Sequence, residues 1–200
     1  MIVLAGGKSR RLGRYKALET LGGQSLIERV IDRLSPLGTE ILVVTAREDQ
    51  AFPPDLQVKR VSDVYPGKGA LVGIYSGLKA ASNFYSLVVA CDMPFLNVAL
   101  LRYLMGLSSG FDAVIPKLEG KLEPLHAVYS KDCLGPIEDM LGEDRLKVTD
   151  LPDRLGVRFV GDKEVETFDP EHLSFFNINS ESDLERARVL LDKERAFLNI

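Results

Sequence analysis

Short runs of residues that are apolar on both faces recur along this chain and limit the folds open to it. A strand with one solvent-facing side alternates apolar and polar residues, so continuous apolar runs are typical of strands buried between two layers. Apolar residues at helical spacing separate these runs over 26–34 and 71–81, and a last helix is expected over about 182–196. This alternation predicts a three-layer α/β fold, with a mainly parallel, twisted sheet and helices on both faces. The expected strands are 2–5, 41–44, 87–91, 113–116, 157–160 and 175–178.

The composition is that of one compact domain. The chain has 200 residues, 46% of them hydrophobic, and we expect a single domain over 1–200 with an acceptor-side subregion at about 117–160. A net charge of −4 is unsuited to a nucleic-acid-binding surface. No apolar run is long enough to span a bilayer and no signal peptide is legible, so we expect a cytoplasmic protein without a membrane partner. Cys91 and Cys133 lack the paired spacing of a zinc site and are expected to be free thiols.

A glycine-rich, basic segment follows the first expected strand. Between residues 4 and 16 the chain holds three glycines and five Lys or Arg residues, with no acidic residue among them. Such a loop, beyond the carboxyl end of a strand, is suited to binding phosphate; the alternative is a turn whose basic side chains are only solvated. The spacing matches neither a Walker loop nor a dinucleotide fingerprint, so it indicates another kind of nucleotide site. The residues are Gly6, Gly7, Gly13, Lys8, Arg10, Arg11, Arg14 and Lys16.

Asp92 directly follows the expected strand 87–91, and Pro94 comes two residues later. A carboxylate at a strand end can hold Mg²⁺, which takes one or two carboxylates together with phosphate oxygens. The alternative is that Asp92 caps the next helix or forms a turn. Because the phosphate-binding segment would lie at the same edge of the sheet, the metal site is the favoured interpretation.

Two further polar groups have both a functional and a structural interpretation. Asp63 precedes a second glycine-rich segment containing Gly69 and Gly73, and its carboxylate could accept paired hydrogen bonds from a purine. The alternative is that this segment only starts and packs a helix. Asn177 and Asn179 end the last expected strand, where capping explains Asn179 more readily than Asn177. Asn177 could instead orient Asp92, a metal-bound water or a ligand phosphate.

His126 is a single histidine that enters an apolar stretch. Such a residue is more often structural than catalytic. No Ser-His-Asp or Cys-His pairing is legible, so the sequence does not call for covalent catalysis.

Five motifs follow one another along nearly the whole chain. They are Leu4-Ala5-Gly6-Gly7 with Arg11-Leu12-Gly13 and Lys16, Gly69-x-Leu71-x-Gly73-Ile74, Cys91-Asp92-Met93-Pro94-Phe95-Leu96, Glu123-Pro124-Leu125-His126-Ala127-Val128-Tyr129, and Phe176-Asn177-Ile178-Asn179. Together they resemble the molybdenum cofactor guanylyltransferases of the MobA type. The first motif is shared by many nucleotidyltransferases, so the specificity of the resemblance rests on the Cys-Asp-Met-Pro and Asn-Ile-Asn segments.

The resemblance implies a Rossmann-like nucleotidyltransferase fold and a Mg²⁺-dependent transfer of GMP from GTP to the terminal phosphate of molybdopterin, with release of pyrophosphate. Lys16 and Asp92 would be catalytic, Asp92 as the Mg²⁺ ligand, and Asp63 would bind guanine. Thr45 falls where the family often has a polar base contact. The residues implied to bind the nucleotide are Leu4, Ala5, Gly6, Gly7, Lys16, Thr45, Asp63, Gly73 and Asp92. Arg145 and Lys147 are cationic candidates for holding the acceptor.

Two positions depart from the family pattern. Tyr15 stands where an aspartate is usual, and Ala70 stands where a proline is usual. These changes leave the choice between GTP and CTP open. The alternative enzyme is a cytidylyl- or sugar-phosphate nucleotidyltransferase, and the alternative outside this class is a non-catalytic nucleotide-binding protein that delivers the cofactor. Cofactor-biosynthesis proteins and molybdoenzymes are the expected protein partners.

Overall fold

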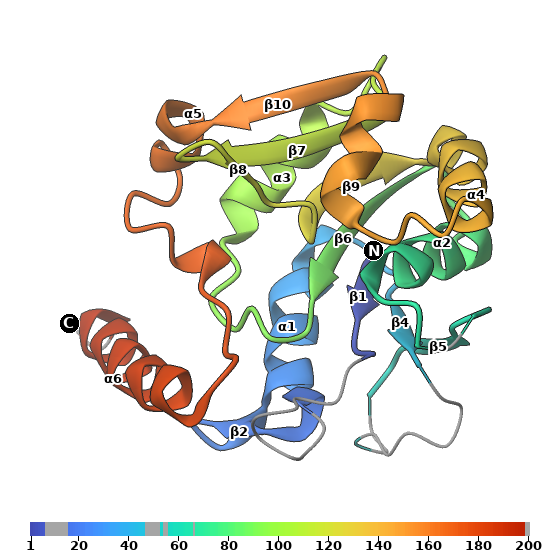
Figure 1. Cartoon of the computed structure of the whole chain (residues 1–200). Coiled ribbons are helices and arrows are strands. Elements are labelled where there is room, and N and C mark those ends of the chain that lie inside the picture. The colour runs from blue at the N-terminus through green and yellow to red at the C-terminus, as the bar shows by residue number, and fades with distance from the viewer. Residues whose placement is uncertain (7–15, 47–52, 54–55, 66, 199–200) are drawn as a thin grey trace.

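The computed structural model describes residues 1–6, 16–46, 53, 56–65 and 67–198, and Figure 1 shows their arrangement. Strands and helices alternate along most of this length. The strands are β1 (Ile2–Leu4), β2 (Thr20–Leu21), β3 (Gln24–Ser25), β4 (Leu42–Thr45), β5 (Lys59–Ser62), β6 (Tyr85–Ala90), β7 (Ala113–Leu118), β8 (Lys121–Leu122), β9 (His126–Ser130) and β10 (Val157–Gly161). The α-helices are α1 (Leu26–Leu34), α2 (Ala70–Ala80), α3 (Val98–Gly106), α4 (Leu134–Gly142), α5 (Asp162–Glu166) and α6 (Glu181–Leu198). Short 3₁₀ helices are η1 (Lys16–Leu18), η2 (Ser35–Leu37), η3 (Lys131–Cys133), η4 (Val148–Arg154) and η5 (Leu173–Phe175).

The described strands form one large sheet and one small hairpin, β2–β3. The large sheet has eight strands in the spatial order β10-β7-β9-β6-β1-β4-β5, with β8 paired to β7. β1 is parallel to both of its neighbours, and Ile2 lies opposite Val88 of β6 and Leu42 of β4. β5 is parallel to β4, and β10 is parallel to β7. Among the described strands of the large sheet, only β8 and β9 are antiparallel to their neighbours, so the expected mainly parallel sheet is confirmed.

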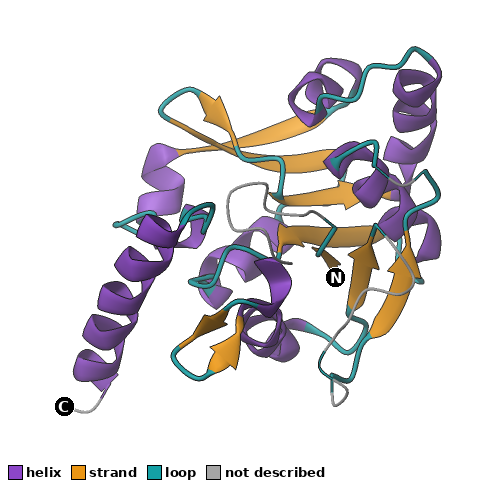
Figure 2. Ribbon diagram, turned by 60° about the horizontal axis from the view of Figure 1, so that its bottom comes forward, coloured by secondary structure: helices purple, strands orange, loops and turns teal. Residues whose placement is uncertain are grey.

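Helices cover both faces of this sheet (Figures 1 and 2). Val3 of β1 belongs to a core with apolar side chains of α1 and α3, whereas Ile2 and Leu4 belong to a core with α2 and α4. Both faces of the central strand are therefore buried, as its unbroken apolar sequence predicts. The predicted three-layer α/β architecture is confirmed.

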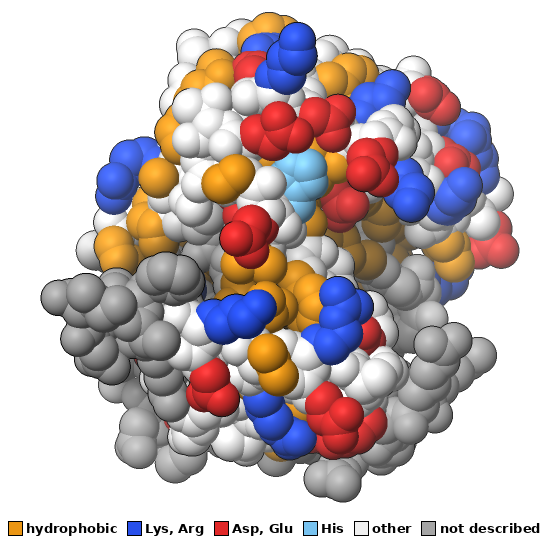
Figure 3. All heavy atoms as spheres, turned by 90° about the vertical axis from the view of Figure 1, so that its left-hand side faces the viewer, with side chains coloured by type: hydrophobic (Ala, Val, Ile, Leu, Met, Phe, Trp, Pro, Cys, Tyr) orange, Lys and Arg blue, Asp and Glu red, His pale blue; other side chains and the backbone are white. Residues whose placement is uncertain are grey.

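The last helix packs against the edge of this core. Ile178 and the inner side of α6 form a third cluster with Leu21, Leu26 and Phe95. Ser180 and Asp183 start α6 by reciprocal bonding, since the Ser180 N–H donates to Asp183 Oδ2 at 2.9 Å and the Asp183 N–H donates to Ser180 Oγ at 3.2 Å. Figure 2 shows α6 as a rod along one side of the molecule. Figure 3 views the molecule from the side on which α5 and α6 lie in Figure 1, where Lys and Arg are interspersed with Asp and Glu.

The prediction of a strand over 175–178 is wrong. Residues Leu173–Phe175 form η5, and residues 176–179 have no regular structure. The segment meets the large sheet end-on: the Ile178 N–H donates to the Asp92 carbonyl at 3.0 Å, beyond the last residue of β6. A strand needs a neighbour along its length, and this segment crosses the end of the sheet. The antiparallel strand β9 was not predicted.

Asp169 anchors the segment that crosses the sheet. Its side chain is 6% exposed, and its two carboxylate oxygens accept the N–H groups of Leu173 at 3.0 Å and Ser174 at 2.8 Å. Ser174 Oγ in turn accepts the Asn97 N–H at 2.8 Å, at the start of α3. These bonds fix residues 173–179 relative to the end of β6.

Replacing the Asp169 anchor is expected to destabilise the protein. Asp169→Ala leaves two N–H groups without their acceptor, which costs about 1–3 kcal/mol of unfolding free energy. Urea denaturation measures this loss. Glu171→Ala is the matched control, because Glu171 carries the same charge at an exposed position nearby, and its effect should stay within about 0.5 kcal/mol. Equal stability of the two variants would contradict the anchoring role.

Candidate functional site

A pocket of about 350 Å³ opens where the parallel strands end. Leu4 of β1, Val44 of β4 and Ala90 of β6 are at or next to the carboxyl ends of three adjacent strands, and all three line the pocket. Open α/β sheets bind ligands at this edge. The other lining residues are Ala5, Gly6, Lys16, Asp63, Gly69, Ala70, Gly73, Cys91, Asp92, Leu125, Asn177 and Asn179.

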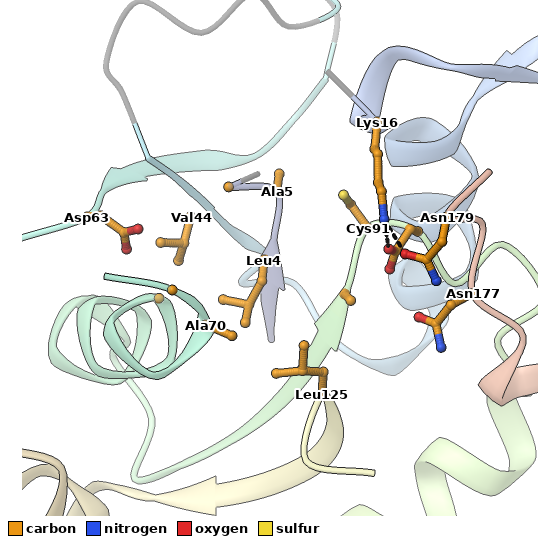
Figure 4. A pocket seen from close by; sticks show the side chains of 15 residues that line it. Leu4, Ala5, Lys16, Val44, Asp63, Ala70, Cys91, Leu125, Asn177 and Asn179 are labelled. Carbon is orange, nitrogen blue, oxygen red and sulfur yellow. Dashed lines mark hydrogen bonds and ion pairs between the residues drawn. The ribbon is translucent and has the colours of Figure 1, made fainter. Parts of the chain in front are cut away.

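Lys16, Asp92 and Asn179 form a polar cluster on one side of the pocket. Lys16 Nζ donates to Asp92 Oδ2 at 2.9 Å and to Asn179 Oδ1 at 2.5 Å. The Lys16 and Asp92 side chains are 19% and 15% exposed. Figure 4 shows Lys16 reaching toward Asn179, with dashed lines for both bonds. One ammonium group is thus held by oxygens from two segments far apart in the chain.

The backbone around this cluster explains how its members meet. Lys16 begins η1, which the buried Ala17 anchors in the core shared with α1. Asp92 lies two residues past β6, and the Cys91 N–H donates to the Leu4 carbonyl at 3.1 Å, which ties this turn to the end of β1. Asn179 follows Ile178, whose N–H bonds the Asp92 carbonyl. Each polar side chain is therefore next to a residue fixed by burial or by a backbone hydrogen bond.

Asp63 lies on the other side of the pocket (Figure 4). It follows β5, and its N–H donates to the Thr45 carbonyl at 2.9 Å. Its Oδ1 atom is buried and has no hydrogen-bond partner in the described part of the chain. Burial raises the pKa of Asp63 to about 6, although a hydrogen bond from Ser76 lowers it in part. A buried carboxylate oxygen without a donor, at the edge of a pocket, is suited to receiving N–H groups of a ligand.

Two glycines at the start of α2 keep the space beside Asp63 open. Gly69 has φ +89°, a conformation that residues with a side chain rarely adopt. A Cβ at Gly73 would lie 3.1 Å from Leu4 Cδ2 and 3.8 Å from Asp63 Oδ1. A side chain at Gly73 would therefore fill the pocket between β1 and Asp63.

The structure brings most of the predicted site residues to this pocket and leaves some elsewhere. Thr45 is buried and does not line the pocket; its backbone carbonyl positions Asp63 instead. Arg145 and Lys147 pair with Asp150 at 3.6 and 3.8 Å, away from the pocket lining. The predicted residues outside the described part of the chain are Gly7, Lys8, Arg10, Arg11, Gly13, Arg14 and Tyr15.

Asn177 lines the pocket, but its side-chain amide donates to the Phe175 carbonyl at 2.9 Å, within its own segment. The helix cap that the sequence allowed for Asn179 is supplied by Ser180, which frees the Asn179 side chain for Lys16. The direct bond between Asn179 and Lys16 was not predicted. Nothing in the local sequence could have indicated it, because 163 positions separate the two residues.

His126 and the cysteines take no part in the polar cluster. His126 is fully buried, and its ring centroid lies 4.5 Å from that of Phe175. Burial lowers the pKa of His126 to about 3, so the imidazole is neutral at physiological pH. Cys91 and Cys133 are free thiols, as expected, and both are buried. Leu125, next to His126, forms an apolar wall of the pocket that was not predicted.

The polar cluster has the ligand chemistry of a hard divalent cation. Asp92 and Asn179 present a carboxylate and an amide oxygen, which are the donors that Mg²⁺ takes, and both already bind one cation, the Lys16 ammonium. Among the described residues, no group of three or more His, Cys, Asp or Glu side chains is placed so that it could hold a metal ion. A metal bound by Asp92 and Asn179 would therefore take its other ligands from phosphate oxygens and water.

Solved structures share this fold. The crystal structure of molybdopterin-guanine dinucleotide biosynthesis protein A from Archaeoglobus fulgidus superposes with a TM-score of 0.85 at 33% identity, covering 96% of this chain and 98% of that one. A 2-C-methyl-D-erythritol 4-phosphate cytidylyltransferase from Thermus thermophilus superposes with a TM-score of 0.69 at 16% identity, covering 96% and 98%. The second likeness concerns the fold alone.

Sequence comparison gives the same result over nearly the full length. A molybdenum cofactor guanylyltransferase from Desulfosudis oleivorans is 35% identical over 199 residues, which cover 97% of this chain and 96% of the relative. The family model described as the MobA-like NTP transferase domain matches residues 1–161. The chain therefore belongs to the MobA-like NTP transferase family.

Proposed function

We propose that this protein transfers GMP from GTP to the terminal phosphate of molybdopterin, forming the guanine dinucleotide cofactor and pyrophosphate. The observation that carries the proposal is the two-sided pocket. The polar cluster of Lys16, Asp92 and Asn179 lies on one side, and the Asp63 oxygen that has no partner among the described residues lies on the other. A nucleoside triphosphate has the matching polarity, with an anionic chain at one end and base N–H groups at the other.

Asp63 supports the choice of guanine. The Watson–Crick edge of guanine presents N1–H and N2–H₂, two donors that one carboxylate can accept together, whereas cytosine and adenine present a different edge. A site with a buried acceptor rejects a base that lacks the donors, because the acceptor then stays unpaired. The buried Oδ1 of Asp63 is such an acceptor.

Lys16 and Asp92 are suited to binding the triphosphate of the nucleotide and its Mg²⁺. The Lys16 ammonium would neutralise charge on the triphosphate as pyrophosphate leaves, and Asp92 with Asn179 would hold Mg²⁺. When bound, Mg²⁺ supplies positive charge to phosphate oxygens, which lessens the repulsion between two anionic reactants.

The acceptor phosphate is already a nucleophile at neutral pH. One of its oxygens forms a bond to the α-phosphorus of GTP while the bond from that phosphorus to the bridging oxygen of pyrophosphate breaks. The residues of this chain therefore act by holding the reactants in line and by electrostatic stabilisation, without a covalent intermediate. Pyrophosphate leaves with both electrons of the broken bond.

The partners and location follow from this activity. GTP and molybdopterin are the proposed substrates, Arg145 and Lys147 are proposed contacts for the acceptor, and proteins of cofactor biosynthesis and molybdoenzymes are the proposed protein partners. None of the helices in the described residues could cross a membrane. The cytoplasm is the proposed location, because both substrates are anionic and GTP is found there.

The direct test is pyrophosphate release from GTP with and without molybdopterin. We expect release that depends on molybdopterin and a divalent metal, and that falls when CTP replaces GTP. Faster release with CTP would favour a cytidylyltransferase. Binding of GTP with no release under any of these conditions would favour a delivery protein.

Removing either charged side chain of the polar cluster is expected to abolish most of the guanylyl transfer. Asp92→Ala and Lys16→Ala each remove a well-placed electrostatic group, and such losses commonly lower the rate about 10²–10³-fold. Lys16→Ala should also weaken GTP binding, which calorimetry measures separately from turnover. Lys163→Ala is the control, because Lys163 is exposed on α5 and does not line the pocket. Normal Mg²⁺-dependent turnover of Asp92→Ala would show that the metal is held elsewhere.

Asp63 is expected to make GTP binding depend on pH. Only the ionised carboxylate accepts both guanine donors, and burial raises the pKa of Asp63 to about 6. Lowering the pH through about 6 should therefore weaken GTP binding, beyond the effect of protonating GTP itself. Asp63→Asn cannot titrate, so it should lose this extra dependence and discriminate less between GTP and CTP. Parallel pH profiles and unchanged discrimination in the two proteins would rule out this role for Asp63.

A further inference from the structure

Lys16 binds the same oxygens that the proposed metal needs. Its Nζ lies 2.9 Å from Asp92 Oδ2 and also bonds Asn179 Oδ1. These two side chains present their oxygens to Lys16, whereas the side-chain amide of Asn177, on the same side of the pocket (Figure 4), bonds its own segment. In this structure the ammonium is therefore bound to the oxygens that are proposed to hold the metal (Figure 4).

A divalent cation bound to Asp92 would compete with this ammonium for the same carboxylate. Both are positive, and the low exposure of the Lys16 and Asp92 side chains, 19% and 15%, limits screening by water. Metal binding to Asp92 is therefore favoured when the lysine has moved away from the carboxylate. Lysine is suited to such a movement, because its charge sits at the end of a flexible four-carbon stem.

We infer that Lys16 keeps Asp92 closed to a divalent metal until the triphosphate of the nucleotide draws the lysine away. This inference rests on the proposed function for the identity of the nucleotide. The triphosphate offers Lys16 a new anionic partner, and the released carboxylate then accepts the metal. Nucleotide and metal both favour the state in which Lys16 has left Asp92, so each tightens the binding of the other by the same factor.

The bond between Lys16 and Asp92 would affect when the metal binds. A metal bound on Asp92 without nucleotide would fill the cluster with a hydrated dication before GTP arrives. With Lys16 in place, the Asp92 charge is neutralised in the empty site, and the metal enters together with the phosphates that supply its other ligands. The pairing thus couples the binding of the metal to the binding of the nucleotide.

The test measures Mn²⁺ binding to the protein without nucleotide. Mn²⁺ binds carboxylate and carbonyl sites as Mg²⁺ does, and its free concentration is read from the electron paramagnetic resonance signal. Lys16→Met removes the charge and keeps the length of the side chain. We expect Lys16→Met to bind one Mn²⁺ about 5–150-fold more tightly than the unaltered protein, the range typical of coupled sites.

Three further variants make the result specific. Lys16→Gln is a second neutral replacement, and it should show the same gain if Met disturbs the fold. Lys163→Met removes one positive charge from an exposed position on α5 and should leave Mn²⁺ binding unchanged. Lys16→Met combined with Asp92→Asn should lose the gain, because the carboxylate that binds the metal is absent. Unchanged or weaker Mn²⁺ binding in both neutral variants would overturn the inference.

This outcome is independent of the transfer reaction, since neither GTP nor molybdopterin is present. Tighter Mn²⁺ binding in the neutral variants, without guanylyl transfer by the unaltered protein, would leave the inference standing and refute the proposed function. Guanylyl transfer by the unaltered protein, without tighter Mn²⁺ binding in the neutral variants, would support the proposed function and overturn the inference.

Discussion

The parallel pairing of β1 with both β4 and β6 is the constraint on which the site depends. Parallel strands end at the same edge of a sheet, so the residues that follow β1, β4 and β6 all begin at the carboxyl-terminal edge. The residues that follow each strand therefore meet there, although they are far apart in sequence. Burial of the central strand on both faces keeps this register, because a shift of one residue would exchange the two cores.

The polar cluster depends on a second constraint, the segment that crosses the end of the sheet. The Asp169 carboxylate holds η5, Ile178 is buried beneath α6, and the Ile178 N–H reaches the Asp92 carbonyl. Asn179 is thereby brought to Lys16 from near the far end of the chain. The cluster is a product of the assembled domain, since no single element contains two of its members.

The two sides of the pocket differ in how their charges are balanced. Asp92 has a counter-ion in Lys16, whereas Asp63 has a raised pKa and an oxygen that no described residue bonds. The first arrangement keeps a charge pair that an incoming anion and cation can separate. The second leaves an acceptor that a ligand donor can satisfy. This asymmetry fits a ligand that is anionic at one end and rich in donors at the other.

The amino-acid sequence by itself determined the class of fold and most of the pocket lining. Unbroken apolar runs identify buried parallel strands, and the residues after such strands are candidates for a site whatever the rest of the chain does. Gly6 and Asp92 follow this rule. Asp63 was proposed from the glycine-rich segment after it and Leu4 from the family resemblance, and the structure brings all four to one pocket.

Only the tertiary structure decided which polar groups touch. The run of residues 175–178 has the composition of a strand, yet its backbone has no neighbouring strand to pair with and crosses the sheet end instead. The pairing of Lys16 with both Asp92 and Asn179, and the distance of Arg145 from the pocket, are likewise set by packing. Local sequence encodes the periodicity of an element, whereas contacts over 76 and 163 positions depend on how the finished elements bury their apolar faces.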